Sequence, residues 1–332
     1  MFPTTHPSSI LCCSENSTSL ENIDMEESPR HHLGHGDDLA APVVSFSGSP
    51  LDSAGFASVS PQDCRDALKA MQAKQGEFMP DATKIGSHGC DTFTHRKKVL
   101  TCMADLCQKL RFTDSTFFDA VNILDRFLGA QTGKLEEVLF PLIGVACVSI
   151  ASKMSEVAVP SLRSLQGYMG ADLPFNPGHI RKMEMGILST LEWKMACVTP
   201  CTVLCYLVKM LRDSYDCISA EEAKVTYSGS MTALKKFVYS KEYVEYTAME
   251  IAAAAVLRAS LSSHQEMCCH DLMMQLEGGK KRSHDGTLAN LCECMTNMES
   301  LDSMGPVYPQ EYHNKRHISR SLSPTTPLGY YL

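Results

Sequence analysis

Lys153 is the residue whose type and position point most directly to chemistry with a partner. It follows an apolar run, from Val138 to Ile150, that is rich in small residues. A helix that is apolar on every face must be buried on every face. A lysine at the rim of such a core costs free energy unless oxygen atoms accept hydrogen bonds from its ammonium group. Those oxygens belong either to this chain, as in an intramolecular salt bridge, or to a partner protein.

The histidine and cysteine patterns do not indicate a catalytic or metal site. His31, His32 and His35 cluster in a segment rich in Ser, Pro and Gly, where no folded site is expected. Cys201 and Cys205 are spaced to share one face of a helix, as core cysteines commonly do. The sequence contains no Gly-rich phosphate loop, no C-x-x-C pair and no metal-ligand spacing. We therefore expect a protein that is not an enzyme and that needs no cofactor or metal.

A short motif near the N-terminus indicates a second binding function. Leu11, Cys13 and Glu15 fit the pattern L-x-C-x-E, by which some proteins dock on retinoblastoma-type pocket proteins. In this mode the leucine and cysteine enter an apolar groove, and the glutamate meets the amides of a helix N-terminus. The alternative is that three fixed positions match by accident in a tail rich in Ser and Cys.

Three separated blocks of the sequence resemble the cyclin box. They are "NILDRFL" at 122–128, "ASKMSE" at 151–156, and "RKMEMGIL" at 181–188 with the "LEW" and "TP" that follow it. The blocks occur in the family's order and at about its spacing, from about residue 94 to residue 207 and more weakly to residue 263. The segments "TCMADLC", "SKM" and "LEWKMACVTP", together with L-x-C-x-E, are most similar to D-type cyclins.

The resemblance implies a kinase-binding surface. Cyclins use a lysine and a glutamate at the positions of Lys153 and Glu184 to hydrogen-bond backbone groups of the kinase's C helix, and Met154, Leu188 and Met195 would form its apolar part. The implied function is that of a regulatory subunit. It would bind and activate a cyclin-dependent kinase, bring it to pocket-protein substrates and so promote the G1/S transition. Kinase inhibitors are a further class of partner that the family implies.

The first box helix carries one expected ion pair and one departure from the family. Arg96 and Asp125 suit a buried bidentate pair between neighbouring helices, and the corresponding pair in cyclins is structural. The same helix has Lys97 and Lys98 next to Arg96, and Cys102 at a tryptophan position. Apolar anchors for R-x-L peptides are thus replaced, which argues against docking of such peptides there.

Two Ser/Thr-Pro pairs lie in the C-terminal tail, at Ser323 and Thr326. Proline-directed kinases phosphorylate such sites, and D-type cyclins carry a phosphodegron in this region. The alternative is that these pairs are common in disordered tails.

The composition favours protein partners over nucleic acids and membranes. The 332 residues are 44% apolar, and the formal net charge of −8 repels phosphates. The longest uncharged stretch, 138–152, is shorter than the ~18 residues of a membrane helix. The 15 cysteines cannot all pair, and no signal-peptide pattern precedes them. We therefore expect a reducing compartment, with the protein in the nucleus and cytoplasm.

Helix caps and the absence of sustained strand alternation predict an all-α fold. Asparagine or threonine precedes proline at 176–177 and 199–200, and Ser219 with Glu222 fits a capping box. Five small or apolar positions of 143–152 recur 108 residues later at 251–260. Chance likeness of alanine-rich helices would explain this recurrence, and so would tandem five-helix repeats. The predicted organisation is a disordered tail with the L-x-C-x-E motif (1–60), an N-terminal helix and linker (61–92), an N-terminal cyclin box (93–198), a C-terminal cyclin fold (199–300) and a disordered tail (301–332).

Two other functions share this fold. One is a transcription-associated cyclin or IIB-like factor, against which the acidic charge, the missing zinc ribbon and the L-x-C-x-E motif count. The other is a scaffold that has lost kinase binding, against which Lys153 and Glu184 count.

Overall fold

The computed structural model describes most of the chain between residues 58 and 300. The described residues are 58–87, 92–131, 135–168, 175–215, 218–260, 262–276 and 284–300. The L-x-C-x-E motif, the two Ser/Thr-Pro sites and nearly all of both predicted tails lie outside them. Within the described ranges the regular structure is helical and contains no strand. The all-α prediction is therefore confirmed.

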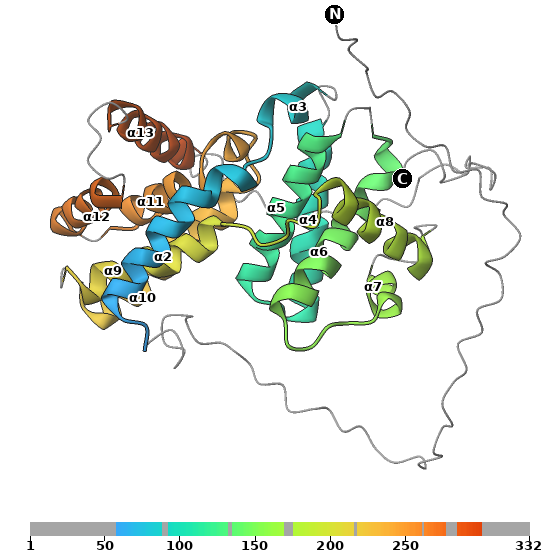
Figure 1. Cartoon of the computed structure of the whole chain (residues 1–332), viewed down its shortest axis with the longest axis horizontal. Helices are drawn as coiled ribbons and strands as arrows, with labels where there is room; N and C mark the ends of the chain where they lie inside the picture. Colours follow the sequence, from blue (N-terminus) through green and yellow to red (C-terminus); the bar gives the residue numbers. More distant parts are fainter. Residues whose placement is uncertain are drawn as a thin grey trace, which may run out of the picture. The chain divides into compact units, whose positions relative to one another are not determined.

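The first group of helices forms the N-terminal box. Its helices are α4 (Thr92–Leu110), α5 (Asp114–Ala130), α6 (Phe140–Ser155), α7 (Leu162–Tyr168) and α8 (Pro177–Thr190), with a short 3-10 helix, η3 (Glu137–Leu139), before α6. The central helix is α6, which packs against α4, α5 and α8 (Figure 1). This placement explains why α6 is apolar on nearly every face.

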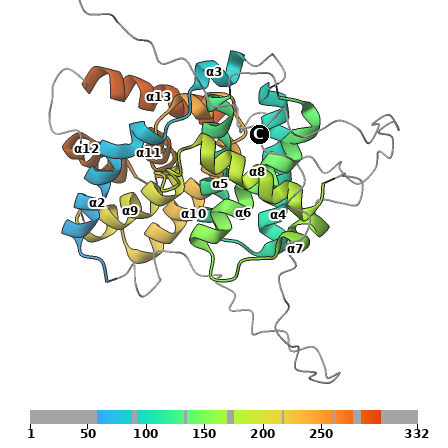
Figure 2. The same cartoon turned by 45° about the vertical axis from the view of Figure 1, so that its right-hand side comes forward.

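The second group of helices repeats this plan. Its helices are α9 (Pro200–Asp213), α10 (Ala220–Phe237), α11 (Ala248–Arg258), α12 (Ser263–Leu276) and α13 (His284–Ser300), with the 3-10 helix η4 (Glu242–Glu245) before α11. Here α11 is central, in contact with α9, α10, α12 and α13 (Figure 2). The two segments that recur 108 residues apart in the sequence are thus the central helices of the two boxes.

The segment before the first box contains more than the single helix that we expected. It comprises α2 (Pro61–Lys74), the 3-10 helix η2 (Gln75–Phe78) and α3 (Ala82–Ser87). The α2 helix packs against α9 of the second box, whereas α3 packs against α5 of the first. Between them, Asn122 Nδ2 on α5 donates to Phe78 O at 3.0 Å, and Met249 N on α11 donates to Gln75 Oε1 at 3.2 Å. This segment therefore joins the two boxes.

Local sequence determines where several of these helices begin. Asn176 Oδ1 accepts from His179 N, and His179 Nδ1 accepts from Asn176 N, so both groups are satisfied at the start of α8. Ser219 and Glu222 form the same reciprocal capping box at α10. Such side chains satisfy amides that have no partner within the helix.

The α6 helix is a core helix, although its composition alone would also fit a membrane span. An 18-residue window within 137–155 has a mean hydropathy of 1.8, yet 72% of this window is buried within the protein. At Gly144 an added Cβ atom would lie 2.6 Å from Val99 Cγ1 on α4. Glycine permits this close approach of the two helices, and any larger residue would require a side chain of α4 to shift.

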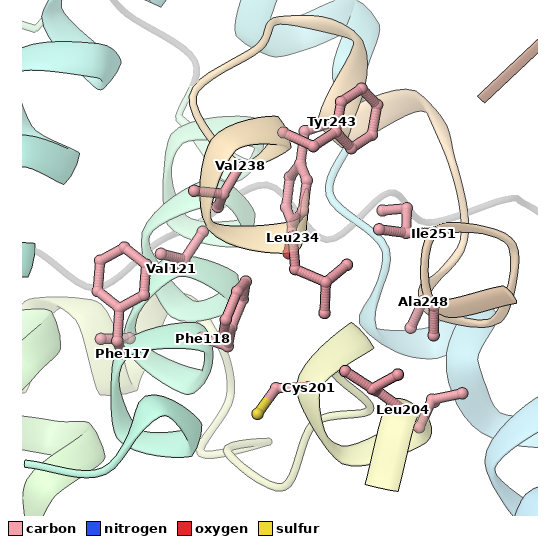
Figure 3. Close-up of a cluster of buried hydrophobic side chains, with 14 of the residues drawn as sticks. Phe117, Phe118, Val121, Cys201, Leu204, Leu234, Val238, Tyr243, Ala248 and Ile251 are labelled. Carbon is pink, nitrogen blue, oxygen red and sulfur yellow. The ribbon is translucent and has the colours of Figure 1, made fainter. Parts of the chain in front are cut away.

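A shared apolar cluster connects the two boxes. Phe118 and Val121 of α5 lie in one cluster with Leu204 of α9, Leu234 of α10 and Val238, which directly follows α10 (Figure 3). All five side chains are fully buried. The boxes are therefore packed as one folded unit.

Candidate functional site

Lys153 and Glu184, predicted from the sequence as a binding pair, lie together between α6 and α8. Lys153 Nζ lies 2.5 Å from Glu184 Oε1. The side chain of Glu184 is only 7% exposed, whereas that of Lys153 is 47% exposed. A buried carboxylate needs a charge partner, and the lysine supplies it while half of its own surface stays open. The intramolecular salt bridge considered above therefore exists, and Lys153 remains accessible.

The predicted apolar residues lie on the same two helices and on the segment that follows α8. Met154 is 45% exposed, and Leu188 and Met195 are half-buried against the core. We call the surface formed by Lys153, Met154, Glu184, Leu188 and Met195 the docking surface.

Four exposed apolar residues, which were not predicted from the sequence as part of a site, lie near the docking surface residues in the chain. They are Val157, Val159, Met185 and Trp193. Val157 is fully exposed, and Trp193 is 62% exposed. Single exposed apolar side chains are common, but four of them on the segments that carry the docking residues favour an interaction site there. Trp193 was already part of the quoted "LEW" block, and that block was the one signal that could have identified it.

The turn after α8 explains the exposure of Trp193. Glu192 and Trp193 have φ angles of 52° and 60°, in the left-handed region. Each such non-glycine residue costs about 1–2 kcal/mol. Trp193 N donates to Leu188 O at 2.9 Å, and the salt bridge between Lys194 and Glu192 spans 2.6 Å. These contacts hold a turn that directs the indole ring away from the core.

The end of α6 is attached to the start of α5. Glu156 Oε1 accepts from Thr113 N at 2.8 Å and from the hydroxyls of Thr113 and Thr116 at 3.0 and 2.5 Å. Glu156 comes three residues after Lys153. Its three hydrogen bonds restrict the position of the helix end that carries Lys153 and Met154.

Arg96 and Asp125 form a bidentate ion pair in the interior. Arg96 Nε and Nη2 donate to the two oxygens of Asp125 at 2.6 and 2.7 Å, and both side chains are at most 2% exposed. Arg96 Nη1 also donates to Val238 O at 2.8 Å, at the end of α10, and the guanidinium lies over the ring of Tyr243. Burial opposes the charge of Arg96, but Asp125 outweighs it, and the pKa of the guanidinium is raised. Arg96 therefore joins the two boxes as well as α4 and α5, which sequence analysis did not predict.

The exposed face of α4 is polar, as its sequence indicates. Lys97, Lys98 and Cys102 are exposed there, and no large exposed apolar residue belongs to the described part of α4. His95 Nε2 lies 2.9 Å from Glu137 Oε1, and Lys98 Nζ lies 3.4 Å from the same atom. The hydrogen bond from His95 lowers the pKa of Glu137.

The described cysteines are free thiols, and several of them are deeply buried. Burial raises the pKa of Cys107 to about 12 and raises that of Cys201 strongly. Thiols with such pKa values are poor nucleophiles at neutral pH. No group of residues in the described ranges is arranged to hold a metal ion.

Comparisons with known proteins agree on one family. Residues 66–196 match the model of the cyclin N-terminal domain. The chain is 30% identical over 206 residues to Cyclin-D4-2 of Arabidopsis thaliana, covering 60% of this chain and 66% of that relative. It is 25% identical over 256 residues to Cyclin-D4-1 of the same plant, covering 75% of this chain and 74% of that relative. The match to Cyclin-D4-2 thus spans just under two thirds of that protein.

A solved structure has the same fold. It is a viral cyclin from herpesvirus saimiri, with a TM-score of 0.57 and 20% sequence identity. The match covers 72% of this chain and 99% of the viral protein. Neither helical box alone is long enough to give this coverage, so the match extends over both boxes.

Proposed function

Because the chain belongs to the cyclin family, with D-type cyclins among its relatives, we propose that it is a regulatory subunit that binds and activates a cyclin-dependent kinase. It has no catalytic role of its own. The observation that carries the proposal is the pair of a half-exposed Lys153 and a buried Glu184, on two helices that also carry the exposed apolar side chains of Met154 and Met185.

The geometry of the Lys153–Glu184 pair suits contact with a kinase helix whose end presents backbone carbonyl groups. The ammonium group of Lys153 has three hydrogens, and Glu184 is its one hydrogen-bond acceptor in the described part of the chain. The other two ammonium hydrogens are available to carbonyl oxygens of a docked kinase helix. Met154, Val157 and Trp193 offer apolar area for burial around that contact. Contact with this surface would hold the kinase's C helix inward, complete the kinase's Lys–Glu pair and order its activation loop.

The test is the affinity of Lys153→Glu for a cyclin-dependent kinase, measured by calorimetry. Reversal of this charge places a carboxylate against kinase carbonyl groups and against Glu184. We expect a loss of about 2–5 kcal/mol, or roughly thirtyfold or more in Kd. Lys182→Glu is the matched control, because Lys182 is exposed on α8, the helix that carries Glu184, and lies outside the docking surface.

Thermal unfolding of both variants separates loss of binding from loss of fold. Lys153→Ala removes the donor without adding a second carboxylate, and it should weaken binding as well. Kinase affinity that stays within twofold of the parent in both Lys153 variants would contradict the proposal. Recovery of a transcription complex, or of no kinase at all, from a lysate would favour the two alternative functions.

The D-type role is the finer part of the proposal. We propose that the protein promotes the G1/S transition and acts in the nucleus and cytoplasm. Leu11, Cys13 and Glu15 would bring the bound kinase to a retinoblastoma-type pocket protein. The L-x-C-x-E pattern and the D-type relatives support this proposal.

A further inference from the structure

Asp119 is a buried acid that the docking surface does not include. It lies on α5 and is only 9% exposed. Its Oδ2 atom accepts from Ser155 Oγ at 3.1 Å, and its Oδ1 atom accepts from Cys197 Sγ at 3.6 Å. No cation pairs with it among the residues that the structure describes. Burial raises its pKa, and the two hydrogen bonds only partly offset this effect.

Stability does not account for a carboxyl group at this position. An unpaired buried acid costs free energy in its ionised form, and an apolar side chain of similar size would not. The neighbouring Phe118, Ala120 and Val121 are fully buried and apolar. Another role is therefore needed to explain the acid.

The two partners of Asp119 belong to the two segments that carry the docking residues. Ser155 is the last residue of α6, two positions after Lys153. Cys197 is two positions after Met195, in the stretch 194–199 between α8 and α9, which has no regular secondary structure. A single carboxyl group on α5 thus connects the end of α6 with this irregular stretch.

We propose that Asp119 is a positioning residue for kinase binding, which fixes the end of α6 relative to the segment that carries Met195. This inference rests on the proposed function. Asp119 itself is too buried to touch the kinase. Its contribution is that the docking residues are ordered before the kinase arrives, so that binding does not have to order them.

Asp119→Leu tests the inference because leucine fills similar space without accepting hydrogen bonds. Two lost hydrogen bonds of about 0.5–1.5 kcal/mol each correspond together to roughly a five- to 150-fold change in an equilibrium constant. Since only part of this free energy appears in kinase affinity, we expect kinase binding to weaken by about three- to tenfold. Ser155→Ala and Cys197→Ala remove one contact each and should have smaller effects in the same direction. Thr232→Ala is the matched control, because it removes an exposed hydroxyl on α10.

Global stability should move in the opposite direction from affinity. The raised pKa of Asp119 means that ionisation of this group opposes folding, so its cost appears as pH rises through the folded-state pKa. At pH 7 Asp119→Leu should therefore unfold at the same or a higher urea concentration than the parent. Hydrogen exchange should become faster in residues 153–158 and 194–199 of the free variant.

A double-mutant cycle shows whether Asp119 acts through its partners. Asp119→Leu and Ser155→Ala should be clearly non-additive in kinase affinity, because both remove the same contact. Unchanged kinase affinity in a folded Asp119→Leu, with Lys153→Glu still defective, would overturn the inference and leave the proposed function intact. Should Asp119→Leu fail to fold, equal affinity of parent, Ser155→Ala and Cys197→Ala would overturn it. A parent protein that binds no kinase would instead refute the proposed function.

Discussion

Asp125→Ala is the substitution whose cost can be worked out most directly from the structure. It removes both acceptors of Arg96 Nε and Nη2 and leaves the guanidinium 1% exposed. The bond from Arg96 Nη1 to Val238 O and the contact with Tyr243 remain. Neither of these supplies a counter-charge.

The expected cost follows from the group that is left behind. Removal of one partner of a buried ion pair typically costs about 3–5 kcal/mol, because the other charge stays buried and uncompensated. A total unfolding free energy of about 5–15 kcal/mol is usual for a folded domain. Asp125→Ala should therefore remove a large part of the stability of the protein.

Urea denaturation followed by circular dichroism measures this change. The matched control is Asp114→Ala, since Asp114 lies 2.7 Å from Lys235 and also joins the two boxes, but both side chains are about 40% exposed. An exposed pair contributes about 0–1 kcal/mol. If Asp125→Ala cost no more than this control, the view of Arg96 as a buried charge that depends on Asp125 would be wrong. Kinase affinity measured on the folded fraction should be close to that of the parent.

Two further predictions concern the N-terminal tail and the helix packing. Deletion of residues 1–20 should leave kinase activity on a generic peptide unchanged. Phosphorylation of a pocket protein should fall, because this substrate is no longer tethered. An unchanged ratio of the two phosphorylation rates would mean that the L-x-C-x-E pattern is accidental. Gly144→Ala should cost about 1–3 kcal/mol because its new methyl group overlaps a side chain of α4. Gly167→Ala on α7 meets no atom within 4 Å and should be neutral or stabilising in the same urea denaturation experiment.

The features that sequence analysis predicted are those with a local cause. Capping residues such as Asn176 and Ser219 act within three positions of themselves, so their effect is visible in the sequence. The apolar run before Lys153 likewise indicated a buried helix that ends at a charged rim. The residues of the docking surface were predicted from the resemblance to cyclins, which assigns them to one surface without any knowledge of distances.

The features that were missed depend on contacts between distant segments. The bond from Arg96 to Val238 O joins residues 142 positions apart, and no periodicity in the sequence indicates it. Asp119 is similar, because an isolated acid in an amphipathic helix is normally exposed. Its burial results from the packing of α5 against the end of α6 and the stretch after α8. Exposure of Val157 and Trp193 also depends on where a helix ends and how the next turn bends.

Arg96 and Asp119 are both buried ionisable groups, yet they should affect function by different routes. Arg96 joins the boxes through bonds to α5 and to the end of α10, so a loss there lowers the fraction of folded protein. The two hydrogen bonds of Asp119 go to the segments next to the docking residues, so its loss should lower affinity while the fold persists. The ratio of the change in kinase affinity to the change in unfolding free energy therefore separates the two groups. It should be small for Asp125→Ala and large for Asp119→Leu. The opposite order would mean that the junction of the boxes, and not the end of α6, determines the shape of the docking surface.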